Sequence, residues 1–302
     1  MPLRHDLRRG VLFMLAACAL FTLMSSLVKA LGDRIPFPEQ MFFRSAFAMP
    51  VAILVAMRVR RGVNLAVALR TKRFKGHLLR ALTGTAATAC SFFALTVLPL
   101  AEHTALTNTT PLFITLLSIP VLGERVGIHR GSAVLVGFLG ILVIALGQGA
   151  LSGDYGGAAR WGLVAAIVHG GFSATTTMLV RSLSATEPST TIVLWQSLLM
   201  TLLTATALPF FWVTPSLPDL LLLVCIGLLG GVAQVLLTEA WASAQVSSLA
   251  PYSYSSLLWA ILFGWIAFGD TPGVLTVAGS TLIVLAGLYI LHREIILKRR
   301  RG

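Results

Sequence analysis

Long apolar stretches, separated by short polar segments rich in glycine and proline, make up most of the chain. A membrane-spanning helix needs about 20 predominantly apolar residues, and each of these stretches approaches that length. The pattern predicts ten such helices, over residues 10–31, 37–57, 76–98, 101–121, 130–148, 160–181, 189–211, 218–240, 246–267 and 273–292.

The segments between these helices are only a few residues long, as in "VLPLAE" and "FGDTPG". Short connections place consecutive helices side by side and antiparallel. The first apolar stretch is long enough to span a bilayer, so we expect it to be retained as a helix rather than cleaved as a signal peptide. The predicted fold is therefore an all-α integral membrane bundle of ten helices.

Composition supports a membrane protein. Of the 302 residues, 56% are hydrophobic and 11% are charged, whereas soluble domains carry about 25% charged residues. The net charge of +12 does not indicate nucleic-acid binding, because the cations lie between apolar stretches rather than on one basic face. The sequence shows no metal-ligand spacing, no phosphate-binding lysine motif and no catalytic constellation, so we expect no metal, no cofactor and no enzyme activity.

Lysine and arginine predict the orientation. Most of the 23 cations fall on the side of the membrane that holds both termini, in the N-terminal segment, in segment 58–80 and in segment 293–301. Arg80 is counted with these loop cations. Because cytoplasmic loops are enriched in Lys and Arg, both termini are predicted to be cytoplasmic, in the inner membrane of a bacterial-type cell.

The two halves of the chain resemble each other. Residues 27–45 align without a gap with residues 179–197, and residues 94–106 align with residues 240–252. The turn "LGERVG" likewise aligns with "FGDTPG". This similarity predicts a duplicated five-helix unit, and an odd number of spans makes the second copy enter the membrane from the opposite side. Such inverted repeats are characteristic of secondary transporters, whose substrates bind near the midplane.

The duplication divides the chain into a first repeat over residues 1–148 and a second repeat over residues 149–302, which ends in a basic tail. The segments "FFALTVLPLAEHTALTNTTPLFITLLSIPVLGERVG" and "TEAWASAQVSSLAPYSYSSLLWAILFGWIAFGDTPG" carry a family pattern: a small-residue turn, a proline-bearing helix, then (L/F)-G-(E/D). On these residues the chain resembles the EamA-type ten-helix branch of the drug/metabolite transporter superfamily. Asp270 stands where that family more often has glutamate.

The resemblance implies transport of a small metabolite, with carriers of amino acids, S-adenosylmethionine and riboflavin as examples, and leaves the substrate and the direction of transport open. We expect alternating access, driven by the substrate gradient or by a coupling proton, with the lipid bilayer as partner and a homodimer as an open option. An integral-membrane enzyme acting on lipid, a channel and a non-transporting scaffold are the alternatives.

Three residues are candidate ligands of the substrate because polar groups inside membrane helices are expensive. Arg44 lies about two turns into its helix and is expected to bind an anionic group such as a carboxylate, or else to form a structural pair. His169, flanked by two glycines, is expected near the midplane, with a packing role as the alternative. Glu239 is a candidate for an amine or a coupling proton, with an interfacial acid as the alternative.

Two proline-containing helix segments form the second set of candidates. Asn108 precedes Pro111, which removes a backbone donor and is predicted to act as a hinge. Pro251 is the predicted hinge of the matching helix, beside the substrate-binding candidates Tyr252, Tyr254 and Trp259.

Trp195 and Gln196 align with the Arg44 region and complete the candidate site; the alternative for the aromatic residues is core packing. The polar residues at helix ends, among them Glu102, His103 and Asp270, are expected to be caps, and Lys29 is expected to be an interfacial anchor.

Overall fold

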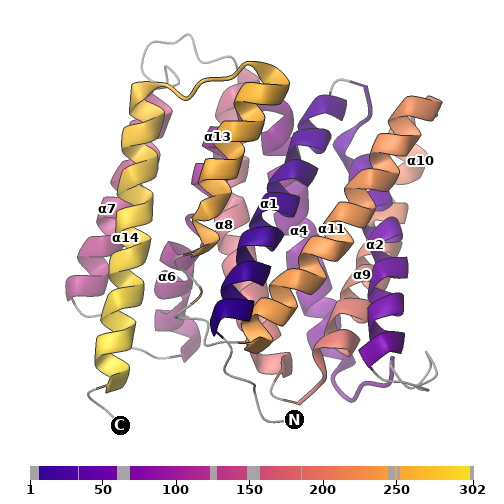
Figure 1. Cartoon of the computed structure of the whole chain (residues 1–302), viewed down its shortest axis with the longest axis horizontal. Helices are drawn as coiled ribbons and strands as arrows, with labels where there is room; N and C mark the ends of the chain where they lie inside the picture. The colour runs from indigo at the N-terminus through magenta and orange to yellow at the C-terminus, as the bar shows by residue number, and fades with distance from the viewer. Residues whose placement is uncertain are drawn as a thin grey trace.

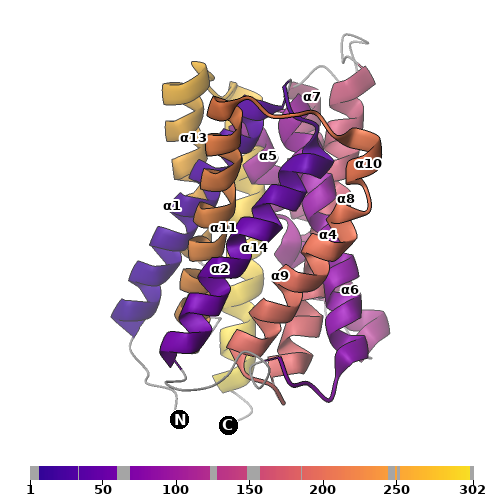
Figure 2. The ribbon, with the colours of Figure 1, turned by 90° about the vertical axis from the view of Figure 1, so that its right-hand side faces the viewer.

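The computed structural model describes residues 7–32, 34–59, 69–122, 128–147, 157–184, 186–243, 249 and 252–299, which form a bundle of helices (Figures 1 and 2). The helices are α1 (Leu7–Leu31), α2 (Phe37–Val59), α4 (Phe74–Val97), α5 (Leu100–Thr107), α6 (Thr110–Leu122), α7 (Ile128–Gly147), α8 (Gly157–Ser184), α9 (Ser189–Ala205), α10 (Leu208–Phe211), α11 (Leu217–Ser243), α13 (Ser255–Phe268) and α14 (Val274–Arg299). No strand occurs among these described residues.

The bundle is built for a lipid environment. Five described helices are long and apolar enough to cross a membrane, within α1, α2, α4, α8 and α11, and shorter apolar helices accompany them. Large apolar side chains such as Trp161 and Val274 are exposed on the outside of the bundle. In water such a surface would be costly, whereas lipid chains solvate it. The prediction of an all-α integral membrane protein is confirmed.

Two stretches that the sequence predicts as single helices are interrupted. The stretch 101–121 divides into α5 and α6, and 189–211 divides into α9 and α10. Each second part has a proline as its second residue, Pro111 and Pro209 respectively, and proline has no N–H to donate to the preceding turn. At the first break the Thr110 hydroxyl donates to the Thr107 carbonyl at 3.0 Å, so a side chain supplies a hydrogen bond where the backbone cannot.

Helix packing relates the two halves of the chain. The most extensive contacts join α4 to α8, α1 to α11, and α7 to α14. The α7–α14 contact depends on glycine: a Cβ placed on Gly140 would lie 2.7 Å from the Gly279 carbonyl oxygen, and a Cβ on Gly279 would lie 2.5 Å from the Gly140 carbonyl oxygen. Neither distance leaves room for a side chain, so these backbones touch directly, as small residues allow in membranes.

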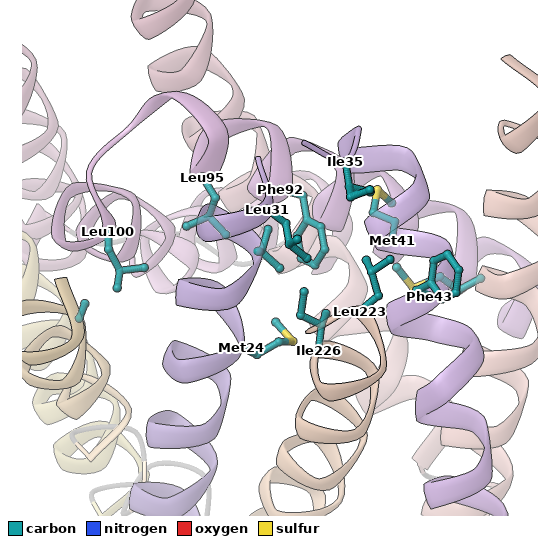
Figure 3. Packing of buried hydrophobic residues seen from close by; sticks show 13 residues of the cluster. Met24, Leu31, Ile35, Met41, Phe43, Phe92, Leu95, Leu100, Leu223 and Ile226 are labelled. Atoms are coloured by element: carbon teal, nitrogen blue, oxygen red, sulfur yellow. The ribbon is translucent and has the colours of Figure 1, made fainter. Parts of the chain in front are cut away.

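An apolar cluster closes one end of the bundle. Its buried members come from the ends of α1 and α4 and the beginnings of α2, α5 and α11, together with Ile35 between α1 and α2, Met200 and Ala260. Figure 3 shows these side chains, including Met24, Phe92 and Leu223, converging between the helices. This end lies opposite the one that carries the N and C marks (Figure 1). We refer to the cluster as the apolar plug.

Polar contacts fasten the same end. Lys29 Nζ lies 3.1 Å from Asp270 Oδ2 and donates to the Leu98 carbonyl at 3.2 Å, which ties α1 to the segments following α4 and α13. Arg34 Nη1 lies 2.8 Å from Asp219 Oδ1. Lys29 was expected to be an interfacial anchor and Asp270 a cap; in the structure they form an ion pair between distant segments.

We expect Gly279→Ala to destabilise the protein by about 1–3 kcal/mol, because its methyl group would overlap the Gly140 carbonyl. The matched control is Gly131→Ala on α7, where nothing lies within 4 Å of an added Cβ and alanine favours the helix. Thermal unfolding in detergent measures both variants. Equal melting temperatures for the two would contradict the direct backbone contact between α7 and α14.

Candidate functional site

A cavity of about 450 Å³ lies in the middle of the bundle. Its walls come from central turns of the helices, for instance Arg44–Ala52 of α2 and Arg80–Phe92 of α4, and from the break between α5 and α6. Met24, Phe92 and Met200 belong both to the cavity lining and to the apolar plug. The plug therefore forms the wall of the cavity that faces the end opposite the chain termini.

The lining combines apolar surface with many polar groups and carries positive charge. Hydroxyl groups from several helices face the cavity: Thr22, Ser25, Thr88, Ser91, Thr107, Ser173, Thr176 and Thr177. Among the described residues, the charged members of the lining are Arg44 and Arg80, and the lining contains two histidines, His103 and His169, but no aspartate or glutamate. Such a chamber offers hydrogen-bond partners to a polar solute and a counter-charge to an anionic one.

Arg44 lines the cavity from α2. Its Nη1 lies 3.8 Å from the Met200 sulfur, a weak acceptor, and its Nε has no hydrogen-bond partner. Gly230 on α11 makes room for Met24, since an added Cβ there would lie 2.9 Å from the Met24 sulfur, and it lies in ordinary contact with Arg44, at 3.6 Å from Nε. The guanidinium is thus positioned by packing rather than by a counter-ion.

Arg80 lies on α4 and is 6% exposed. Its Nη1 donates to Gln196 Oε1 at 2.6 Å and to the Ile192 carbonyl at 3.3 Å, while its Nε has no partner. The Gln196 amide fits against Gly84, where an added Cβ would lie 2.8 Å from Nε2. Gln196 therefore fixes one side of the guanidinium, while the enclosed Nε stays without a hydrogen bond.

The two histidines have different partners. His169 Nδ1 lies 2.9 Å from the Ala87 carbonyl oxygen, and because a carbonyl only accepts, this nitrogen carries the hydrogen. His103 Nε2 lies 2.8 Å from Ser91 Oγ, and His103 Nδ1 has no partner. Both rings are held by neighbours on α4 while they face the cavity.

Four of the predicted site residues meet in this cavity: Arg44, Asn108, His169 and Gln196. Asn108 lies at the break between α5 and α6 and donates from Nδ2 to Ser256 Oγ of α13 at 3.0 Å. It thereby joins the two proline-containing regions that the sequence singled out. Pro111, the predicted hinge, begins α6 just after this break, and Pro251 lies outside the described residues.

The other predicted site residues lie away from the cavity lining, and their role in binding stays a prediction. Glu239 lies 3.9 Å from Arg9, and both side chains are about half exposed. Tyr252 is exposed, Tyr254 is buried, and the Trp259 ring stacks on Phe263.

Trp195 belongs to a separate cluster. Its Nε1 donates to the Leu69 carbonyl at 3.0 Å, and its ring stacks on His77 with centroids 5.9 Å apart. His77 Nε2 lies 2.6 Å from Glu187 Oε2, and Thr71 donates a hydrogen bond to the same carboxylate. These contacts fasten α4 to the segment between α8 and α9.

The sequence interpretation misplaced two residues. Arg80 was assigned to the loop cations, but α4 begins at Phe74 and places Arg80 inside the bundle. His103 was expected to be a helix cap, but it is buried and lines the cavity. A helical signal for Arg80 was present: Arg80, Gly84, Ala87 and Ser91 follow each other at spacings of three and four residues and share one helix face.

An all-helical membrane bundle around a polar central cavity is the architecture of a solute carrier. Comparison with known proteins specifies the class. The model of the EamA-like transporter family matches residues 8–146 and 160–292, and this protein is a member of that family, within the drug/metabolite transporter superfamily. The members that it resembles are transporters and not enzymes.

Several curated relatives cover nearly the whole chain. The pseudopaline exporter CntI of Pseudomonas aeruginosa is 31% identical over 284 residues, which cover 93% of this chain and 95% of that protein. A riboflavin transporter of Vibrio cholerae is 29% identical, with 99% and 98% covered. An S-adenosylmethionine uptake transporter of Rickettsia prowazekii is 25% identical, with 94% and 93% covered.

A solved crystal structure shares the fold. It superimposes with a TM-score of 0.66 at 21% identity and covers 97% of this chain and 98% of that one. The arrangement of helices is therefore one already seen in an experimental structure.

The contacts of Glu187 predict a pH-dependent stability. Burial alone would raise the pKa of Glu187, but the hydrogen bonds from Thr71 and His77 and the charge of His77 outweigh burial and lower the pKa. A carboxylate with a lowered pKa stabilises the folded state above the pKa of an unfolded glutamate, about 4.3, and loses this effect as the pH falls through the folded value.

Glu187→Gln should therefore lower stability by roughly 1–2 kcal/mol at pH 7, and the difference from the wild type should shrink as the pH falls below about 4. Thermal unfolding in detergent across this range measures it. Glu239→Gln is the control, because its exposed pair with Arg9 contributes little. A Glu187→Gln difference that grows toward acid pH would refute the assignment.

Proposed function

We propose that this protein is a secondary transporter that moves a small polar metabolite across the inner membrane by alternating access, with the central cavity as the substrate site. The cavity is the single observation that carries the proposal. Its volume of about 450 Å³ suits a metabolite, since small-molecule sites measure about 300–1,000 Å³. It carries many polar groups, it lies deep in an otherwise apolar bundle, and helices from both halves of the chain line it.

The proposed topology is ten spans in two inverted five-helix repeats, with residues 1–148 and 149–302 as the repeats and both termini in the cytoplasm. Packing supports it. The sequence alignment makes α8 the counterpart of α1 and α11 the counterpart of α4. If each helix is replaced by its counterpart from the other repeat, the contact between α1 and α11 becomes the contact between α8 and α4. These two contacts are among the most extensive in the bundle. The basic terminal segments support the orientation.

The proposed cycle begins from the state seen here, in which the apolar plug and the Lys29–Asp270 ion pair close the end opposite the termini. Opening that end requires α1 to move away from α4 and from the segment after α13. Two structurally related halves make a second packing of similar energy available, and this is the physical basis of alternating access in repeat-built carriers.

The alternatives have weaker support. An enzyme acting on lipid would need clustered acids and histidines, and the described residues contain no group of three or more His, Cys, Asp or Glu side chains that could hold a metal. A channel would lack a closed end. A homodimer is not required, because a single chain supplies the cavity lining. Among the described lining residues, His103 and His169 are the candidates for a coupled proton, beside the predicted Glu239 outside the lining.

Counterflow in proteoliposomes tests the proposal. Candidate metabolites are first screened for thermal stabilisation of the purified protein, which measures binding by mass action. For a stabilising compound we expect saturable uptake that is accelerated by the same unlabelled compound inside the vesicles. Ser173→Trp, which fills the cavity, should abolish uptake. Val168→Trp, on the exposed face of the same helix, should leave it near the wild-type rate. Non-saturable flux without counterflow would indicate a channel.

The ion pair provides a separate prediction about the closed end. We expect Asp270→Asn to open that end more often, because Lys29 loses its counter-ion. The reporter is a single cysteine, introduced by Met24→Cys into a background that lacks Cys18, Cys90 and Cys225, and it lies on the cavity wall formed by the plug. A membrane-impermeant maleimide added outside intact cells should label this cysteine several-fold faster when Asp270→Asn is also present than when Asp270→Glu is present. Equal labelling rates would remove this ion pair from the gate.

A further inference from the structure

Two arginines line the cavity without a carboxylate among its described residues. Arg44 and Arg80 both belong to the lining, which includes no aspartate or glutamate in the part of the chain that the structure describes, and none of the ion pairs among the described residues involves either arginine. A buried charge without a partner is strongly destabilising, and more so inside a membrane. The cavity therefore has an excess of positive charge that an anionic ligand would neutralise.

The two guanidinium groups meet the same face of α9. Arg80 donates to Gln196, and Arg44 contacts Met200 one helical turn further on. Gln196 Nε2 in turn lies 3.7 Å from the Met200 sulfur. Side chains one turn apart on a helix are neighbours, about 6 Å apart at Cβ. The charges are thus close enough for one small molecule to reach both, and their mutual repulsion favours such a molecule.

Each guanidinium has a donor that is not satisfied. Nε of Arg44 and Nε of Arg80 are enclosed and have no hydrogen-bond partner. An arginine binds a carboxylate through two parallel N–H donors, so a carboxylate toward which the guanidinium turns would satisfy this donor. The three contacts that position the arginines are neutral, Gln196 and the Ile192 carbonyl for Arg80 and Met200 for Arg44, so none of them is a counter-ion that competes with an anion for the charge.

We propose that Arg44 and Arg80 form one bipartite site for a small organic acid with two carboxylate groups, one on each guanidinium. The proposal rests on the proposed function, because it specifies the substrate class of the same cavity. The hydroxyls of the lining serve the uncharged part of the molecule. Organic cations are poor ligands, because the described residues of the lining offer them no carboxylate.

The probes are the dicarboxylates succinate, glutarate and adipate at matched ionic strength, measured by thermal stabilisation of the full-length protein in detergent. We expect at least one to raise the melting temperature with saturation. Its monoamide, which lacks one charge, should need at least about tenfold higher concentration, and the diamine of equal length should have no effect. Glycerol 3-phosphate tests whether one phosphate dianion replaces two carboxylates; stabilisation by it alone would overturn the proposal, as would no stabilisation by any dicarboxylate.

Arginine variants test whether the dicarboxylate binds at Arg44 and Arg80. Arg44→Gln and Arg80→Gln should each weaken dicarboxylate binding at least about tenfold and make the dicarboxylate and its monoamide equivalent. Arg70→Gln is the matched control, since it removes the same charge at an exposed position outside the cavity. An unchanged dicarboxylate response in both cavity variants would overturn the proposal.

The variant Gln196→Glu tests the site even where an arginine variant fails to fold. Glutamate has nearly the same shape as glutamine, and its carboxylate gives Arg80 an internal counter-ion at the position where Gln196 Oε1 now accepts a hydrogen bond. We expect a higher melting temperature without ligand and loss of dicarboxylate stabilisation. A full dicarboxylate response in this variant would contradict the site.

The transport assay separates the two proposals. Saturable counterflow of a neutral or cationic compound, with no response to dicarboxylates, would overturn the dicarboxylate site and leave the transporter standing. Dicarboxylate binding that depends on both arginines, without counterflow of the bound compound, would overturn the transporter and leave the site.

Discussion

The absence of water around this bundle is the constraint on which the rest of the structure depends. In lipid a polar group must find its partner inside the protein, and most hydroxyls here do so locally. Thr22 and Ser26 on α1 donate to the carbonyls of Cys18 and Thr22, one turn earlier, and Ser45 on α2 donates to that of Met41. Hydroxyls satisfied in this way remain available as acceptors on the cavity wall. Polarity is thus concentrated at the centre of the bundle, where a solute can use it.

Close packing takes over the role that the hydrophobic effect has in water. Lipid chains are as apolar as leucine side chains, so helices associate through shape and small residues. Gly140 and Gly279 let α7 and α14 touch backbone to backbone, Gly230 admits Met24, and Gly84 admits Gln196. The first pair holds the bundle together, and the latter two make room for side chains of the cavity. Glycine therefore stabilises a helix contact at the periphery of the bundle and makes room for side chains at its centre.

Sequence reasoning predicted the helices well, because a run of about 20 apolar residues has few other uses. It placed Arg44, Asn108, His169 and Gln196 among the candidates, and these line the cavity. It missed Arg80 because charge near a helix start is typical of loops, and only the stripe through Gly84 and Ser91 indicates an inward face. It could not separate Trp195 from Gln196, since adjacent residues on a helix point about 100° apart and packing alone decides which one meets the cavity.

The contact between Arg44 and Met200 links the charge of the cavity to the closed end of the bundle. Met200 is part of the apolar plug and also the residue against which the Arg44 guanidinium rests. Met24, another plug residue on the cavity wall, lies beside Arg44 at Gly230. A ligand that draws Arg44 toward itself must change the packing of these two methionines, whose unbranched side chains adapt easily. In the proposed cycle, binding at the centre would act on the closed end by direct contact, without a long-range pathway through the protein.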